Sequence, residues 1–290
     1  MCRLFGMVGA GNAKHWLLEA PNSMRALGEW NPHGVGVGGF VDGKLQLDKS
    51  ALRASQDPLF GNQEWLDRSD TIVSHVRDAT VSGPAVQNSH PFEMHGRLFA
   101  QNGSIGDLAR LDKELGSARS LVRGNTDSER YAALVARNIE RNGGDVEAGI
   151  AETVNWLADT TPMTSINFVM TTPTDMWALR YPDARELFVN RIGLRDAAQG
   201  QRLLLPEGAS GTRPGGAATL VASEPLDAEA GWIALKPGQL LHVRAGDLRE
   251  EITQVIDREP KFRLDNNFRS PDSPPDPHLS EAYLARKQPA

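Results

Sequence analysis

A series of short β-rich runs separated by turn signals constrains the fold more than any other feature of the sequence. The clearest case is the stretch GVGVGGFVDGKLQLDKS at 34–50. There two such runs flank Asp42-Gly43, a dipeptide typical of tight hairpin turns. The stretch at 3–11, RLFGMVGAG, is short, apolar and bounded by glycine, which predicts a buried strand. A chain built from such runs has to bury its apolar strand faces in packed sheets.

Helical patterns occupy less of the chain. We predict a helix over 16–30 that breaks near Pro21, and two mid-chain helices at about 126–141 and 145–159. The remaining β-rich runs lie at 71–77, 96–105, 165–172, 175–181, 186–192, 218–226, 239–246 and 248–255. Many strands and few helices in one continuous run predict a single α+β domain, with sheets packed on each other and helices outside.

Two segments depart from this pattern. Residues 205–219 are rich in Gly and Pro, and we predict an exposed loop there. From about Asp257 the sequence becomes polar and Pro-rich. We therefore divide the chain into a folded domain at 2–257 and a C-terminal tail at 258–290, which is either poorly ordered or an arm docked on another surface.

Composition excludes several classes of function. The formal net charge of −6 argues against nucleic-acid binding. The single cysteine excludes an intrachain disulfide framework and a Cys-based zinc site, and cytoplasmic location is the default expectation. No run approaches the roughly 18 apolar residues of a membrane span, and the N-terminus does not look like a signal peptide. The chain has no Gly-Lys-Ser/Thr phosphate loop, and GVGVGG lies in a hairpin, so we expect no cofactor and no metal.

The one cysteine, Cys2, directly follows the initiator methionine. Removal of Met1 would place a free α-amino group, with a pKa of about 8, beside the thiol. That amine could accept the thiol proton and so activate a nucleophile. A buried structural cysteine is the alternative.

Two further stretches predict binding groups at strand ends. Arg77 closes the run SHVR at 74–77, where a guanidinium could bind a carboxylate with two parallel hydrogen bonds. Asn102 and Gly103 follow another strand, where a side-chain amide and a backbone N–H could form an oxyanion hole. The alternatives are a solvated surface arginine and an ordinary Asn-Gly turn.

A fourth stretch, NTDSE, begins a predicted helix. Thr126 and Glu129 form a capping box, which leaves the carboxylate of Asp127 available for a substrate ammonium group. An α-amino acid needs an anion and an arginine fork, and its side-chain amide needs a nucleophile and an oxyanion hole. Together the four stretches predict a site for glutamine or another γ-glutamyl amide.

The order of these motifs resembles that of the class II glutamine amidotransferases, which are N-terminal-nucleophile hydrolases, and most of all their short stand-alone bacterial members. The similarity covers about residues 2–245. The motifs that carry it are Cys2, HVRDAT at 75–80, NSHPF at 88–92, QNG at 101–103, TDSE at 126–129, ALRYPD at 178–183 and VASEPLDAEAGWIALKPGQLLHV at 221–243.

The resemblance implies a four-layer αββα sandwich of two antiparallel sheets with outer helices. It implies that Cys2 attacks the amide carbon, that ammonia leaves from a thioester, and that water releases glutamate. It also assigns roles to six further residues. These are Asn102 and Gly103 for the oxyanion hole, Arg77 and Asp127 for the substrate carboxylate and ammonium group, Thr80 as a site threonine, and His90 in a supporting role.

The chain departs from the family pattern at two positions. Gln101 stands where many members have histidine, and Asp78 stands where some have a bulky aromatic residue. The second change could alter loop closure over glutamine or admit a larger substrate.

Three functions fit these residues. The first is a glutaminase or amidotransferase subunit that supplies ammonia to a synthetase partner. The second is a stand-alone hydrolase of a γ-glutamyl metabolite. The third is a non-enzymatic amino-acid sensor, which would not need the nucleophile. A sheet domain with a Pro-rich arm could also form a homodimer.

Overall fold

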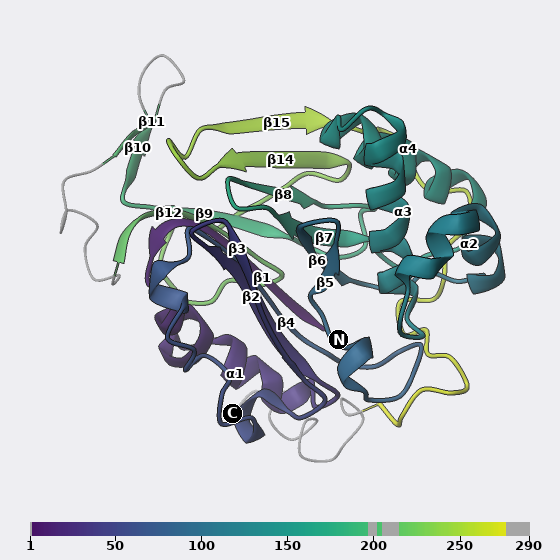
Figure 1. Cartoon of the computed structure of the whole chain (residues 1–290), viewed down its shortest axis with the longest axis horizontal. Helices are drawn as coiled ribbons and strands as arrows, with labels where there is room; N and C mark the ends of the chain where they lie inside the picture. The colour runs from purple at the N-terminus through teal and green to yellow at the C-terminus, as the bar shows by residue number, and fades with distance from the viewer. Residues whose placement is uncertain (1, 197–201, 205–214, 277–290) are drawn as a thin grey trace.

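The computed structural model describes residues 2–196, 202–204 and 215–276. Within these residues, two antiparallel sheets lie face to face and helical segments cover their outer sides (Figure 1). This arrangement confirms the predicted α+β sandwich.

The first sheet holds the N-terminal strand near its centre. In spatial order its described strands are β13 (Ile233–Ala234), β9 (Phe188–Ile192), β12 (Gly215–Ala222), β1 (Arg3–Gly11), β4 (Thr71–Val76), β2 (Val35–Val41) and β3 (Lys44–Ser50).

The second sheet carries the mid-chain and C-terminal strands. In spatial order these are β15 (Glu250–Gln254), β14 (Gln239–Arg244), β8 (Asp175–Leu179), β7 (Asn167–Thr171), β6 (Arg97–Asn102) and β5 (Phe92–Met94). A separate ribbon pairs β10 (Leu194–Asp196) with β11 (Arg202–Leu204).

The helices lie in two outer layers. Beside the first sheet are η1 (His15–Glu19), α1 (Met24–Leu27), η2 (Gly28–Trp30), η3 (Ala54–Gln56) and η4 (Leu66–Arg68). Beside the second sheet are α2 (Leu108–Leu115), η6 (Gly116–Leu121), α3 (Asp127–Arg141) and α4 (Val146–Thr160), and η5 (Val86–Asn88) lies in the connection before β5.

The packing of strand β1 explains why its sequence is apolar after Arg3. Leu4 and Val8 belong to the core between the sheets, whereas Phe5 and Met7 belong to the core under α1. Both faces of the strand are therefore buried, and the usual alternation with polar residues is absent. A Cβ on Gly6 would lie 2.7 Å from the side chain of Val169, so this glycine lets the two sheets approach closely.

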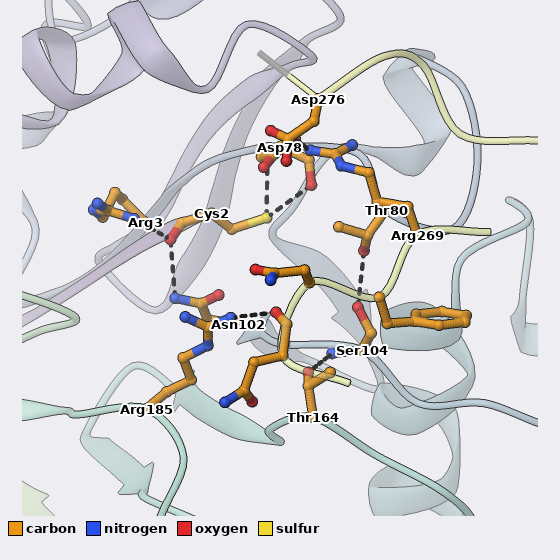
Figure 2. A pocket seen from close by; sticks show the side chains of 14 residues that line it. Cys2, Arg3, Asp78, Thr80, Asn102, Ser104, Thr164, Arg185, Arg269 and Asp276 are labelled. Carbon is orange, nitrogen blue, oxygen red and sulfur yellow. Dashed lines mark hydrogen bonds and ion pairs between the residues drawn. The ribbon is translucent and has the colours of Figure 1, made fainter. Parts of the chain in front are cut away.

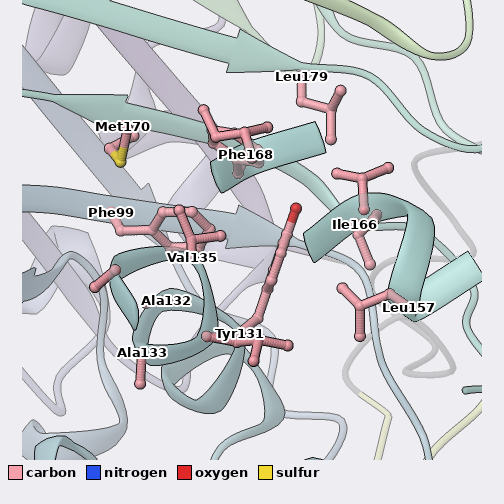
Figure 3. Close-up of a cluster of buried hydrophobic side chains, with 14 of the residues drawn as sticks. Phe99, Tyr131, Ala132, Ala133, Val135, Leu157, Ile166, Phe168, Met170 and Leu179 are labelled. Atoms are coloured by element: carbon pink, nitrogen blue, oxygen red, sulfur yellow. The ribbon is translucent and has the colours of Figure 1, made fainter. Parts of the chain in front are cut away.

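The helical layer over the second sheet is anchored by aromatic side chains. Phe99 of β6 and Phe168 of β7 stack with centroids 4.9 Å apart, and Tyr131 of α3 meets both rings edge-on (Figure 3). Such edge-on and offset pairs add to the burial energy. This packing fixes the position of the α3 N-terminus, which carries Asp127.

Most predicted elements are confirmed. The strand at 3–11 and the helices near 126–141 and 145–159 are present, and the segment at 16–30 forms short helical turns interrupted around Pro21. The hairpin turns at Asp42 and Gly43, both with positive φ. The loop predicted at 205–219 is wrong for 215–219, which pair with β1 in strand β12, and 205–214 lie outside the described residues.

Residues 258–276 form a segment that we call the C-terminal arm. It contacts the folded body along its length. Leu264 donates a backbone hydrogen bond to Met163 at 2.9 Å, and Ser270 donates one to Thr80 at 2.8 Å. In Figure 1 the arm is the yellow trace that crosses below α2 and α3. The tail residues 277–290 lie outside the described residues, and the division into two parts at residue 257 stays a prediction.

Candidate active site

The thiol of Cys2 lies where the ends of three strands meet. Cys2 precedes β1, β4 ends at Val76, and β6 ends at Asn102. The Cys2 sulfur lies 3.2 Å from the backbone nitrogen of Asp78 and 3.2 Å from the carbonyl oxygen of the same residue. The Asn102 amide donates to the Cys2 carbonyl oxygen at 2.9 Å (Figure 2). These contacts fix the nucleophile candidate from both sheets.

The surroundings of this thiol do not favour its ionised form. Cys2 is partly exposed as a residue. The protein packed around the sulfur, and then the negative charge of Asp78, raise the pKa of the thiol. A nucleophilic Cys2 therefore needs a base close by.

A narrow cavity on one side of the thiol contains the predicted head-group residues. Arg77 and Asp127 are both almost fully buried and both line it. Arg77 donates to the carbonyl oxygens of Ser82 at 2.9 Å and Gly83 at 3.1 Å. The cavity volume is about 10 Å³, which is barely enough for one water molecule. In this state the space for an amino-acid head group is almost closed.

Burial of the Asp127 carboxylate in its charged form is energetically unfavourable. Burial raises the pKa of its carboxyl, although the Ile105 N–H donates to it at 2.7 Å and the Ser128 N–H also favours the ionised form. Arg77 contributes a weaker stabilisation of the same charge. A cation arriving in the narrow cavity would favour the carboxylate further.

A pair of buried histidines lies behind this cavity. The rings of His75 and His90 are 4.0 Å apart, and Phe92 lies 4.5 Å beyond His90. Burial lowers the pKa of His75 to about 3 and places that of His90 well below its usual range. Both rings are therefore neutral, and His90 also lines the narrow cavity.

Gln101, which departs from the family pattern, has a structural role. Its amide nitrogen donates to the Ser165 carbonyl at 3.1 Å, and its oxygen accepts from the Ser128 hydroxyl at 2.5 Å. The side chain thus ties β6 to the first turn of α3. It leaves the neighbouring oxyanion-hole candidates in place.

Gly103 adopts a conformation that only glycine tolerates. Its φ is +129°, and a Cβ would lie 2.0 Å from the Ser165 carbonyl oxygen. The peptide at the end of β6 therefore turns sharply toward the cavities beside Cys2.

A larger cavity, of about 240 Å³, opens on the other side of the thiol. Part of its wall is the C-terminal arm. Its lining residues are Cys2, Arg3, Asp78, Thr80, Asn102, Gly103, Ser104, Thr164, Arg185, Asn266, Asn267, Phe268, Arg269 and Asp276. Thr80 lines both cavities, and its hydroxyl is 2.8 Å from that of Ser104.

Asp78, the second departure from the family pattern, joins the arm to the site. Its buried carboxylate forms an ion pair with Arg269 and lies 3.6 Å from the imidazole of His33. Arg269 also donates to the Ala79 carbonyl at 2.7 Å and pairs with Asp276 at 3.2 Å. An arginine of the arm thus covers the position at which some members of the family carry a bulky aromatic residue.

All seven site residues predicted from the sequence line one or both cavities. They are Cys2, Arg77, Thr80, His90, Asn102, Gly103 and Asp127. Their chemical roles stay predictions. The sequence analysis missed the cavity residues Arg3, Arg185 and those of the arm. No local pattern in the sequence marks these residues as part of the site.

Within the described part of the chain, one group could offer metal ligands. Glu147, His242 and Glu251 place ligand atoms within 4.8 Å of one another, but none of them lines either cavity. His242 already contacts Asp175 at 2.7 Å. No helix of the described residues is both long and apolar enough to cross a bilayer.

The family comparison agrees with this geometry. The model of the class-II glutamine amidotransferases matches residues 1–265. The chain belongs to this family of enzymes. Family membership favours an amide-transfer function on glutamine, and it overturns the alternative of a non-enzymatic sensor.

Several relatives have similar sequences. An uncharacterized protein of Methanocaldococcus jannaschii is 25% identical over 278 residues, which cover 90% of this chain and 74% of the relative. The putative glutamine amidotransferase YafJ of Escherichia coli is 26% identical over 255 residues, which cover 82% of this chain and 96% of YafJ. The glutamine–fructose-6-phosphate aminotransferase of Aquifex aeolicus is 30% identical over 161 residues, covering 54% of this chain but 26% of the aminotransferase. The chain thus spans about a quarter of the length of such aminotransferases.

Solved structures show the same fold. The glutamine phosphoribosylpyrophosphate amidotransferase of B. subtilis aligns with a TM-score of 0.63 at 19% identity, over 89% of this chain and 50% of that one. A glutamine aminotransferase class-II domain protein from Silicibacter pomeroyi aligns with a TM-score of 0.58 at 20% identity, over 87% and 99%. At these identities the likeness speaks for the fold alone.

Proposed function

We propose that the protein hydrolyses the γ-carboxamide of glutamine, with Cys2 as the nucleophile after removal of Met1. One observation carries this proposal. A single thiol lies between a cavity lined by a buried arginine and aspartate and a cavity lined by Asn102 and Gly103. These are the groups that the two ends of glutamine require.

In the proposed reaction, the α-amino group of Cys2 accepts the thiol proton and the sulfur attacks the amide carbon. Asn102 and the Gly103 N–H stabilise the resulting oxyanion. The C–N bond breaks as the nitrogen takes up the proton, so ammonia leaves and a thioester remains. Water then attacks the thioester, glutamate is released, and the sulfur recovers its proton. The raised pKa of the thiol explains why an adjacent amine is needed.

The narrow cavity would hold the amino-acid head group. Arg77 would exchange its bonds to the backbone carbonyls at 82 and 83 for the substrate carboxylate, and Asp127 would bind the ammonium group. Because the cavity is almost closed, we propose that the loop at 82–83 moves when glutamine binds. Thr80 and His90 would shape the walls.

A second function is favoured by the size of the other cavity. Hydrolysis of a γ-glutamyl amide with a larger leaving amine would use the same nucleophile and head-group site. Ammonia is about the size of water, and a volume near 240 Å³ is many times the ~10–15 Å³ that a cavity needs to hold one water molecule.

The biological setting belongs to this proposal as well. In the first function a synthetase would receive the ammonia, and in the second none is needed. Cytoplasmic location and a homodimer also stay proposals.

Intact-mass measurement and a glutaminase assay test the nucleophile. Protein without Met1 should release equimolar glutamate and ammonia from glutamine, or equimolar glutamate and the free amine from a γ-glutamyl amide. Cys2→Ala should lose at least ~10³-fold in kcat yet still bind glutamine. A glutamine-derived electrophile should add covalently to Cys2. Turnover by the Cys2→Ala variant would rule out the mechanism.

A further inference from the structure

The larger cavity has a charge arrangement that the hydrolysis of glutamine itself does not use. We propose that it binds the leaving amine of a γ-glutamyl amide, and that this amine carries a carboxylate held by Arg185. The inference rests on the proposed function, because it names the substrate class of the same site.

The position of the cavity suits a leaving group. It shares Cys2, Thr80 and Gly103 with the narrow cavity, which would hold the glutamyl head group. A γ-glutamyl amide attacked at Cys2 has to extend away from that head group. The part beyond the scissile bond would therefore enter the larger cavity.

The charged residues that line the cavity differ in whether an oppositely charged side chain pairs with them. Both of its acidic residues, Asp78 and Asp276, form ion pairs with Arg269 of the arm. Arg3 pairs with Glu224 at 2.9 Å, a residue outside the lining. Arg185 donates to the backbone carbonyl of Asn266 at 2.7 Å.

Arg185 is thus the cationic side chain whose charge is least compensated. Among the residues that the structure describes, no carboxylate pairs with its guanidinium. Burial and then the charge of Arg3 lower the pKa of Arg185, which means that its surroundings disfavour its positive charge. An anion bound in the cavity would reverse that penalty.

The arrangement of the charged side chains favours a ligand that carries one negative charge. Figure 2 shows Arg3 and Arg185 on the Asn102 side of the thiol and Arg269 on the other side, against Asp78. Of the three arginines that line the cavity, Arg3 is paired with Glu224 and Arg269 with the two aspartates. This leaves the positive charge of Arg185 without a carboxylate partner among the described residues. A carboxylate matches that charge and the forked donor geometry of arginine. The substrate class is therefore the γ-glutamyl amino acids and peptides.

The test compares two substrates that differ in one group. γ-Glutamylglycine carries the carboxylate, and γ-glutamylethylamide has a leaving amine of similar length without it. The wild-type enzyme, with Met1 removed, should prefer γ-glutamylglycine in kcat/KM by about tenfold or more. Arg185→Gln should bring that ratio close to one, and Arg185→Lys should restore part of it. Arg110→Gln, which removes an exposed arginine of α2, should keep the wild-type ratio.

The binding of both compounds to Cys2→Ala protein, with and without Arg185→Gln, separates the two proposals. A preference for γ-glutamylglycine that Arg185→Gln abolishes supports the carboxylate subsite, even where the wild type shows no turnover. An absence of turnover of glutamine and of both amides would overturn the proposed function only. Equal affinity for the two compounds, or a preference that survives Arg185→Gln, would overturn the subsite.

Discussion

The two cavities beside Cys2 are built in different ways. The narrow one is lined mainly by residues from strand ends and from the start of α3, together with Thr80, Val81 and His90 from the connection between β4 and β5. The larger one takes part of its wall from the C-terminal arm, which is held by backbone hydrogen bonds and by Arg269. The comparison teaches that the groups proposed to bind a glutamyl head belong to the core, whereas those proposed to bind the leaving amine come partly from the C-terminal arm. Changes in the first cavity should therefore cost more than changes in the second.

The largest expected effect concerns the turn at the end of β6. Gly103→Ala should lower the free energy of unfolding by about 4 kcal/mol, because a Cβ there meets the Ser165 carbonyl at a positive φ. Gly43→Ala is the matched control, since Gly43 also has a positive φ but nothing within 4 Å of its Cβ. It should cost about 1 kcal/mol. Equal losses in chemical denaturation would show that the narrow cavity is less rigid than we infer.

The next effect concerns the head group. Asp127→Asn should raise the KM for glutamine roughly a hundredfold, because the substrate ammonium group would lose a buried carboxylate. Asp145→Asn, at the N-cap of α4, tests for a general effect of altering a helix start and should change KM little. Steady-state kinetics distinguishes the two. A normal KM in the Asp127 variant would remove this residue from the binding site.

The stability of the protein should depend on pH because of His75, which is buried behind the narrow cavity. The pKa of His75 is about 3 in the folded protein, so between that value and its unfolded value near 6.5 the unfolded chain binds more protons. Stability should therefore fall as the pH drops below about 6.5. The loss should reach about 2 kcal/mol at pH 5 for this residue.

Denaturant unfolding between pH 7 and 5 measures this slope. His75→Leu should reduce this slope, and the part that remains should come from His90, whose pKa is also lowered by burial. His15→Gln, which changes a histidine beside Glu19, should leave the slope as in the wild type. An unchanged slope in the His75 variant would assign the acid sensitivity to other groups.

The smallest effect should come from the arm. Arg269→Gln removes the ion-pair partner of the buried Asp78. We expect the arm to detach locally in this variant, which would let water reach that carboxylate and limit the loss of stability. We expect a global loss of about 1 kcal/mol, together with faster amide exchange in 258–276. Arg263→Gln, which removes an exposed pair with Glu259 on the same segment, should leave exchange near Thr80 as in the wild type. Unchanged exchange in the Arg269 variant would show that the backbone bonds alone hold the arm.

The sequence predicted the parts of the site that depend on local structure. A strand end, an Asn-Gly turn and a capping box can each be recognised within a few residues, and they located Arg77, Asn102 and Asp127. Arg185 and Arg269 could not be found in this way, because only long-range packing brings them to the thiol. Helix α2 was missed although its leucines at 108, 111 and 115 have helical spacing, because a stretch of only eight residues is too short for periodicity to identify a helix.

The central place of β1 in its sheet has a consequence for maturation. Its neighbours are β4, at 71–76, and β12, at 215–222, so the first strand has no complete set of partners until most of the chain has been synthesised. During that interval the N-terminus is still open to an aminopeptidase. The proposed loss of Met1 would thus take place on the nascent chain. The α-amino group of Cys2 would then be exposed before strand β1 has paired with both of its neighbours.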